Sequence, residues 1–178
     1  NEKILVIKEQ GIGDEIIYSS MYPDLIKNFP NCVIETEKRL LSIFKRSFGS
    51  NNIFVPFSSF SKDKKKLKTF QKVLYAGSLG KLFRNNSSDF PKKNYLKVDE
   101  KIFHNIKNRV EELSKFYKIG LTWNSKREII GKDKSVTLDI LKPILDLENF
   151  TFINLQYGNI EKELDNYNKN NRNKIYKI

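Results

Sequence analysis

Asp14 is the residue whose type and spacing best suit it to chemistry in this sequence. It follows two closely spaced glycines, Gly11 and Gly13, and precedes apolar residues at roughly helical spacing. Two glycines allow a tight turn, and an acidic residue suits the positive end of a helix dipole. A carboxylate held there can accept a proton from a bound hydroxyl group. It can equally cap the helix that it opens, and the sequence alone leaves both interpretations open.

The same turn only partly fits a dinucleotide-binding fingerprint. Its two glycines match the first two of G-x-G-x-x-G, and Glu35 or Glu37 stands about twenty residues later, where an acid is expected. The third glycine position is Ile16, and a carboxylate at the helix tip would repel a pyrophosphate. The sequence therefore disfavours a dinucleotide-dependent oxidoreductase.

The turn follows an apolar segment that is typical of a buried parallel strand. Residues 4–7 read Ile-Leu-Val-Ile, a short and unbroken apolar run. A strand, a glycine turn and an acid-tipped helix form the first unit of an α/β sheet, whose ligand lies beyond the carboxyl ends of the strands. Further strands are expected at residues 31–35, 53–55 and 72–75, with an amphipathic helix at 38–48.

The pattern of strands and helices restarts at Lys118. Strands are expected at residues 119–123, 150–155 and 174–178, separated by helices at 138–147 and 160–167. A helix at 101–116 is the last element before the restart. The sequence therefore predicts an α/β protein with mainly parallel sheets in two domains, residues 1–117 and residues 118–178.

Composition narrows the class of protein. With 178 residues and 39% hydrophobic content, the chain can bury one ordinary core or two small ones. No apolar run approaches the roughly 20 residues of a membrane span. Cys32 is the single cysteine, so we expect no disulfide framework, no cysteine metal site and a reduced, cytoplasmic setting. The net charge of +12 would suit anionic partners, but the lysines are scattered, and we interpret the charge as a compositional bias.

Three polar features are interpreted as structural. The run Lys64-Lys65-Lys66 is typical of a solvated loop. His104 lies off the apolar stripe of its predicted helix, which indicates a surface residue. The segment 35–37 reads Glu-Thr-Glu and is the nearest approach to a D-x-D metal motif, so no metal site is predicted.

Several sequence blocks together carry a family resemblance. In order they read GIGDEIIYSSMYPDL, VIETEKRLLSIFKRSF, GSLGKLFRNN, IGLTWNSK, KSVTL and FINLQYG. They resemble the glycosyltransferases that follow tetratricopeptide repeats in bacterial proteins, which are similar to the ADP-heptose:lipopolysaccharide heptosyltransferases of glycosyltransferase family 9. The likeness runs from about Lys3 to Gly158. It implies a GT-B architecture of two Rossmann-like domains, with an acceptor on the first and a nucleotide-sugar donor mainly on the second, which is incomplete in this apparent fragment.

The resemblance also implies a reaction and its residues. Asp14 would be the general base of a metal-independent direct displacement, which moves a sugar from a nucleotide sugar to a sugar, lipid-linked or protein acceptor. Lys134 is the first choice for the donor phosphate because it stands just before the helix at Leu138. Arg39 and Gln156 fit a structural role as well. The implied acceptor-side residues are Gly11, Gly13, Arg39, Gly77, Ser78 and Arg84, and the implied donor-phosphate residues are Thr122, Asn124, Ser125, Lys126, Lys134 and Gln156.

The expected partners follow from the same resemblance. We expect no cofactor besides the nucleotide-sugar substrate, tetratricopeptide repeats upstream, no specific nucleic acid and no transmembrane segment. The expected location is cytoplasmic, including the inner face of the membrane. The alternative function is a non-enzymatic basic α/β module that binds RNA or another polyanion, which the aromatic residues interleaved with lysines at 54–70 would serve.

Overall fold

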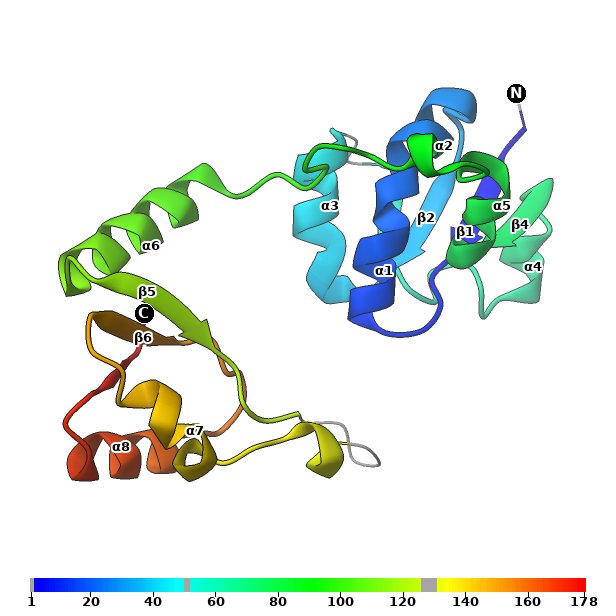
Figure 1. Ribbon diagram of the computed structural model, residues 1–178. Helices are drawn as coiled ribbons and strands as arrows, with labels where there is room; N and C mark the ends of the chain where they lie inside the picture. The colour runs from blue at the N-terminus through cyan, green and yellow to red at the C-terminus, as the bar shows by residue number, and fades with distance from the viewer. Residues whose placement is uncertain (1, 50–51, 126–130) are drawn as a thin grey trace. The chain divides into compact units, whose positions relative to one another are not determined.

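The computed structural model describes residues 2–49, 52–125 and 131–178 and divides into two compact units (Figure 1). Unit 1 is Asn1–Glu100 and unit 2 is Lys101–Ile178. The sequence placed the boundary near Tyr117, whereas the structure groups the helix before this residue with unit 2. Both units are α/β with parallel sheets, as the sequence predicted.

Unit 1 is built on a four-stranded parallel sheet with the strand order β3-β2-β1-β4. The strands are β1 (Ile4–Ile7), β2 (Val33–Thr36), β3 (Phe54–Pro56) and β4 (Lys72–Tyr75). From β1 the chain builds outward to β3 and then crosses to β4 on the other side of β1. The carboxyl ends of β1 and β4 are therefore the point where the strand order reverses, which is the usual position of a ligand in such sheets.

The connections of unit 1 carry short helices. They are α1 (Ile12–Tyr18), η1 (Ser19–Met21), α2 (Tyr22–Asn28), η2 (Lys38–Leu40), α3 (Leu41–Phe48), α4 (Lys64–Leu67), η3 (Ala76–Leu79), α5 (Gly80–Phe83) and η4 (Ser87–Asp89). An aromatic cluster of Tyr22, Phe44, Phe48 and Phe54 joins α2 and α3 to the sheet, with ring centroids 5.6 to 5.9 Å apart. Edge-to-face and tilted contacts at these separations are favourable, so unit 1 has a well-packed core.

Unit 2 has a smaller sheet with the strand order β5-β6-β7. Its elements are α6 (Glu100–Leu113), β5 (Tyr117–Leu121), η5 (Lys132–Lys134), α7 (Leu138–Leu145), β6 (Phe150–Asn154), α8 (Glu161–Asn170) and β7 (Ile175–Tyr176). The core packs Trp123 and Phe152 against Leu145 of α7 and Leu164 of α8. Each strand pair is parallel, so α7 and α8 are the crossover connections.

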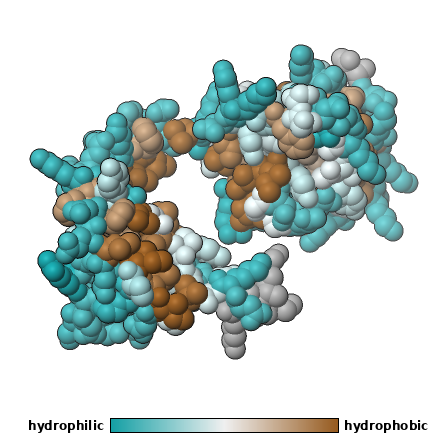
Figure 2. Space-filling view, in the orientation of Figure 1, coloured by the Kyte–Doolittle hydropathy of each residue, from teal (hydrophilic) through white to brown (hydrophobic). Residues whose placement is uncertain are grey.

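Much apolar surface of unit 2 remains open to solvent. The helix α6 buries none of its residues, and His104 on it is exposed, in line with its interpretation as a surface residue. The side chains of Tyr117, Ile140, Leu155 and Tyr157 are each more than half exposed. Figure 2 shows apolar side chains gathered on the visible face of this unit. No helix in the described part of the chain is long and apolar enough to cross a membrane.

Candidate functional site

The carboxyl edge of the sheet in unit 1 gathers polar side chains, which we call the edge cluster. Some follow β1 directly, some end β2, and two stand on the first turn of α1. The members of the edge cluster are Lys8, Glu9, Gln10, Asp14, Glu15, Thr36 and Glu37.

Glu15 is the buried centre of the edge cluster, with none of its surface exposed. Its Oε2 accepts hydrogen bonds from Thr36 Oγ1 at 2.6 Å and from the backbone N–H of Glu37 at 3.0 Å. Its Oε1 forms an ion pair with Lys8 Nζ at 3.1 Å. Burial acts to lower the pKa of Lys8, but the hydrogen bonds and charges of Glu15 and Glu37 outweigh burial and raise that pKa. Glu15 therefore fastens α1 to the ends of β1 and β2.

Asp14 caps the first turn of α1 and is only partly buried. Its Oδ2 accepts a hydrogen bond from the backbone N–H of Gly11 at 2.9 Å. Among the residues that the structure describes, no group binds its Oδ1. The capping role that the sequence left open is therefore present, and one carboxylate oxygen remains for a ligand. The role of general base stays a prediction.

The turn before Asp14 uses a different residue for its unusual backbone than the sequence indicated. Gln10 adopts a left-handed φ of 60°, whereas Gly11 is extended with a φ of −94°. A Cβ on Gly13 would meet nothing within 4 Å. The glycines are therefore not required here by a positive φ, and the constraint falls on Gln10.

Glu9 links the carboxyl ends of β1 and β4, where the strand order of the sheet reverses. Its Oε1 accepts the backbone N–H of Gly77 at 2.9 Å. A Cβ on Gly77 would lie 2.2 Å from that oxygen and 3.2 Å from the ring of Tyr18, so a larger residue here would displace the Glu9 carboxylate. Gly77 and the exposed Ser78 thus lie at the edge where the sequence placed them.

The two predicted acceptor-side arginines have different surroundings. Arg84 is nearly buried, with Nη1 donating to Asp24 Oδ2 at 2.8 Å and Nη2 donating to the carbonyl of Ser20 at 2.6 Å. These bonds tie α5 to η1 and α2, so its guanidinium is engaged within the fold. Arg39 is exposed and lies 3.6 Å from Glu37 at the rim of the edge cluster.

Glu35 serves the fold, as its interpretation as a structural acid predicted. It is fully buried, and its carboxylate accepts the backbone N–H groups of Ser58, Phe60 and Ser61 at 2.6 to 3.2 Å. The loop after β3 therefore folds around this one carboxylate. In the described part of the chain, no group of three or more His, Cys, Asp or Glu could hold a metal ion.

The predicted donor-phosphate residues lie at the carboxyl edge of the sheet in unit 2. Gln156 is buried, and its Oε1 accepts the backbone N–H groups of Trp123 at 3.0 Å and Asn124 at 2.8 Å. It thus joins the ends of β5 and β6, which is the structural role that the sequence had left open. Thr122 is exposed, and Ser125 donates its backbone N–H to Ser135 Oγ at 2.9 Å.

Two lysines were predicted to bind the donor phosphate, and the structure describes one of them, Lys134. Lys126 lies outside the described residues. Lys134 is exposed in η5, next to Ser135. The N-terminus of α7 is already capped by Thr137, whose Oγ1 accepts the N–H of Ile140 at 3.3 Å. One of the N–H groups that made this terminus attractive for a phosphate is therefore engaged.

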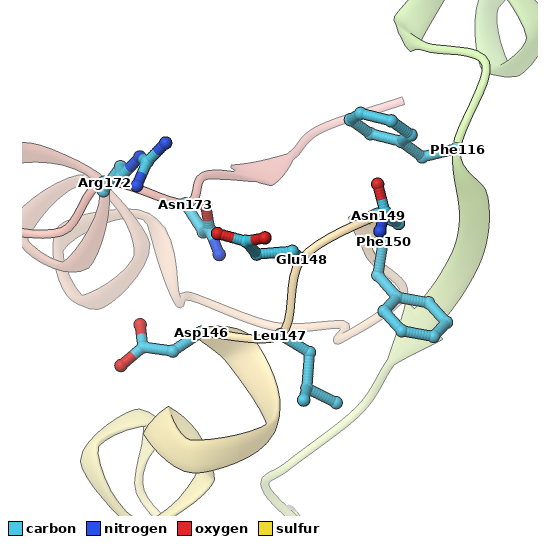
Figure 3. A pocket seen from close by; sticks show the side chains of 8 residues that line it. All are labelled: Phe116, Asp146, Leu147, Glu148, Asn149, Phe150, Arg172 and Asn173. Atoms are coloured by element: carbon cyan, nitrogen blue, oxygen red, sulfur yellow. The ribbon is translucent and has the colours of Figure 1, made fainter.

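A pocket of about 430 Å³ lies at the opposite, amino edge of the unit 2 sheet (Figure 3). None of the sequence-predicted site residues lines it. The carboxylates of Asp146 and Glu148 and the guanidinium of Arg172 surround it, but these side chains are exposed and the depression is open. The remaining lining residues are Phe116, Leu147, Asn149, Phe150 and Asn173.

Sequence reasoning missed the parts of the edge cluster that are held by distant residues. Lys8 and Glu9 were not singled out, and Glu15 was expected only as an acid at the start of the helix. Glu15 stands four residues before Ser19, the first residue of η1, and both are buried. Two polar residues at this spacing lie on one helical face, but their types give no sign in the sequence that this face is the inner one.

Comparison with known proteins gives one informative match. No model of a protein family matches the chain, and no solved structure matches it. The chain is similar to Protein FlbA of Caulobacter vibrioides, with 24% identity over 176 residues, which covers 92% of this chain and 30% of FlbA. The chain thus spans about a third of the length of this curated relative.

This match corrects the family resemblance. The sequence blocks suggested a glycosyltransferase similar to family 9, yet the curated match is to FlbA and no family model supports that assignment. The assignment to that family is therefore wrong. Each block is short, and glycine turns after parallel strands recur in unrelated α/β folds, so the blocks carried less information than their order suggested.

Proposed function

We propose that unit 1 binds a hydroxyl-bearing ligand at the carboxyl edge of its sheet and that Asp14 accepts the hydroxyl proton during a group-transfer reaction. The position of Asp14 carries this proposal. One carboxylate oxygen is fixed by the N–H of Gly11, and the side chain is partly exposed beside the point where the strand order reverses. A base must be fixed in position and open to its substrate, and Asp14 meets both conditions.

The charge of the edge cluster supports a neutral, polar ligand. The edge cluster holds four carboxylates, those of Glu9, Asp14, Glu15 and Glu37, against the ammonium group of Lys8, which pairs with Glu15 and Glu37, and the exposed Arg39 at its rim. The cluster is therefore acidic, although the whole chain has a formal net charge of +12. An acidic edge repels a phosphate but can hydrogen-bond the hydroxyl groups of a polyol.

The proposed step moves one proton and one group. The ligand hydroxyl gives its proton to Asp14 Oδ1 as its oxygen attacks the donor, and the leaving group departs with the bonding electrons. A positioned base typically accelerates such a step about 10²- to 10⁴-fold. Sugar transfer from a nucleotide sugar is one reaction of this kind. That donor, the GT-B arrangement, the upstream repeats and a location at the inner face of the membrane stay predictions.

The test is Asp14→Asn in the full chain, with a set of nucleotide sugars as donors, polyols as acceptors and release of nucleoside diphosphate as the readout. Asn keeps an oxygen for the Gly11 N–H, so the fold should persist while release falls at least about 10²-fold. Glu2→Gln, an exposed acid at the amino end of the same sheet, is the control and should keep full activity. Equal release by Asp14→Asn and the wild type would reduce Asp14 to a helix cap. No release by the wild type with any donor would overturn the transfer step.

A further inference from the structure

The connection from β3 to β4 carries the densest positive charge in the sequence, which we call the α4 lysine surface. It consists of five exposed lysines within seven residues, with Asp63 as the one acid among them. Among the described residues, no carboxylate pairs with any of these lysines, and Lys66 donates only to the carbonyl of Ser59 at 3.2 Å. The α4 lysine surface comprises Lys62, Lys64, Lys65, Lys66 and Lys68.

These lysines stand on an ordered backbone, not on the solvated loop that the sequence suggested. Asp63 caps α4, because its Oδ1 accepts the backbone N–H groups of Lys65 at 2.9 Å and Lys66 at 3.3 Å. The preceding loop is fixed by the buried carboxylate of Glu35. The backbone is therefore arranged before any partner arrives, which lowers the ordering cost of binding.

Two aromatic rings lie at the two ends of the same segment. Phe60 and Phe70 pack edge to face with ring centroids 5.1 Å apart. Lys66 Nζ lies 6.0 Å from the centroid of Phe60, and Lys3 Nζ lies 4.9 Å from that of Phe70. The positive surface thus continues to Lys3 at the amino end of β1.

The acids of unit 1 do not neutralise this surface. Glu15 and Glu35 are fully buried and bonded inside the fold. The edge cluster lies at the carboxyl ends of the strands, whereas α4 leads into the amino end of β4, where Gln71 bonds Lys3. The exposed acid at this amino end, Glu2, pairs with Lys72 and not with the α4 lysine surface. The charges of unit 1 are therefore segregated, and positive charge concentrated on one side attracts an extended polyanion.

We propose that the α4 lysine surface binds the phosphate backbone of nucleic acid without reading its sequence. Lysine offers a point charge to phosphate, whereas base recognition favours the planar fork of arginine, and no arginine lies in residues 57–72. A membrane surface fits less well, because lipid binding by a helix needs an apolar face. The four-residue α4 has only Leu67 as an apolar residue, and its side chain is half-buried.

The test is a fluorescence-anisotropy titration of the full chain with labelled oligouridine over a series of salt concentrations. The double variant Lys64→Ala, Lys65→Ala should fold, because alanine favours helix and Asp63 caps backbone groups only. Each lost phosphate contact on a single strand lowers the slope of log K against log salt by about 0.7, so the slope should fall by about 1.4. The matched control is Lys92→Ala, Lys93→Ala, two adjacent exposed lysines after η4, and its slope should stay within about 0.3 of the wild type.

Two further arms separate the sources of phosphate. A labelled duplex of the same length shows which form of nucleic acid binds more tightly, and a preference for either form supports the proposal. Vesicles of phosphatidylserine are the competing anionic surface. Equal slopes for the wild type and the α4 variant, an equal loss in the control variant, or binding to vesicles but not to nucleic acid would overturn the proposal.

Discussion

Units 1 and 2 are both parallel α/β structures, but they satisfy their interiors differently. Unit 1 buries charged side chains, and hydrogen bonds offset the cost of removing them from water. Glu15 and Glu35 are fully buried and together accept five hydrogen bonds from described groups. Unit 2 buries no carboxylate among its described residues, and it leaves large apolar side chains such as Tyr117 and Leu155 more than half exposed. Unit 1 therefore depends on a few specific polar contacts, whereas unit 2 depends on a thin apolar core.

This difference predicts which substitutions should lower the stability of each unit. Removing one partner of a buried, bonded charge is costly because the remaining groups lose their partner inside the fold. Changes at a half-exposed apolar surface are cheap because water and side-chain motion accommodate them. Trp123, the one tryptophan of the sequence, lies in the core of unit 2, so its fluorescence reports that unit alone.

The largest effect should come from Glu15→Ala. It leaves the hydroxyl of Thr36 and the backbone N–H of Glu37 without their buried acceptor, and it leaves Lys8 with Glu37 alone at 3.3 Å. We expect unit 1 to lose about 3–5 kcal/mol of stability. Amide hydrogen exchange of β1, β2 and β4 measures this loss. The urea transition of Trp123 fluorescence should not move, because unit 2 has a hydrophobic core of its own.

Glu2→Ala is the matched control for that experiment. Glu2 pairs with Lys72 at 2.7 Å, but both side chains are about half exposed, so its removal should cost at most about 1 kcal/mol. A loss as small as this for Glu15→Ala would contradict the claim that unit 1 relies on its buried acids.

The next effect concerns pH and Cys32. Burial raises the pKa of the Cys32 thiol from 9.0 to about 11. The folded thiol therefore stays protonated at pH values where the unfolded thiol ionises. Its contribution to stability is complete below pH 9, falls as the pH rises and is lost by about pH 11, which amounts to about 3 kcal/mol at most.

Cys32→Ala isolates this contribution. The stability of unit 1, again measured by hydrogen exchange, should decline less steeply between pH 9 and 11 in the variant than in the wild type. The thiolate absorbance, taken as the difference spectrum between the two proteins, should show a midpoint near pH 11 in buffer and near pH 9 in urea. Parallel pH profiles would show that burial of Cys32 is not linked to stability.

The smallest effects come from two glycines in comparable strand-end settings. Gly77→Ala pushes Glu9 away and breaks the Gly77–Glu9 hydrogen bond, which should cost unit 1 about 1 kcal/mol. Gly120→Ala in β5 meets Leu155 Cδ1 at 2.3 Å, but Leu155 is 58% exposed and can rotate into solvent. Because alanine is the better strand residue, Gly120→Ala should leave the Trp123 transition within about 0.5 kcal/mol of the wild type. Equal costs at the two sites would remove the contrast between the units.

The sheets could be predicted from the sequence because a buried parallel strand is a continuous apolar run. Residues 4–7 are such a run and form β1 with these bounds. The unit boundary could not be placed in the same way. The apolar spacing of α6 shows that the helix has an apolar face, but that spacing does not say which sheet the helix accompanies, and the structure groups it with unit 2.

The candidate site was predictable only where it is local. Asp14 bonds Gly11 three residues away, and that distance is visible in the sequence as a capping pattern. Glu15 is bound by Thr36, 21 residues away, and Arg84 by Asp24, 60 residues away. Contacts over such separations depend on the packed fold, so the sequence did not show that Glu15 is buried or that Arg84 bonds within the fold, and it assigned Arg84 to a ligand.

The carboxylate of Glu35 links two parts of the sheet to one loop. Its acceptor groups are in place only after β2 exists, and its donors lie just beyond β3, so the loop at 58–61 closes once these neighbouring strands pair. Closing that loop shortens the flexible chain that must still bring β4 to the far side of β1, and a shorter free loop loses less entropy on closure. Glu35 thus couples the pairing of β2 with β3 to the closure of the loop at 58–61, so that neither is complete without the other.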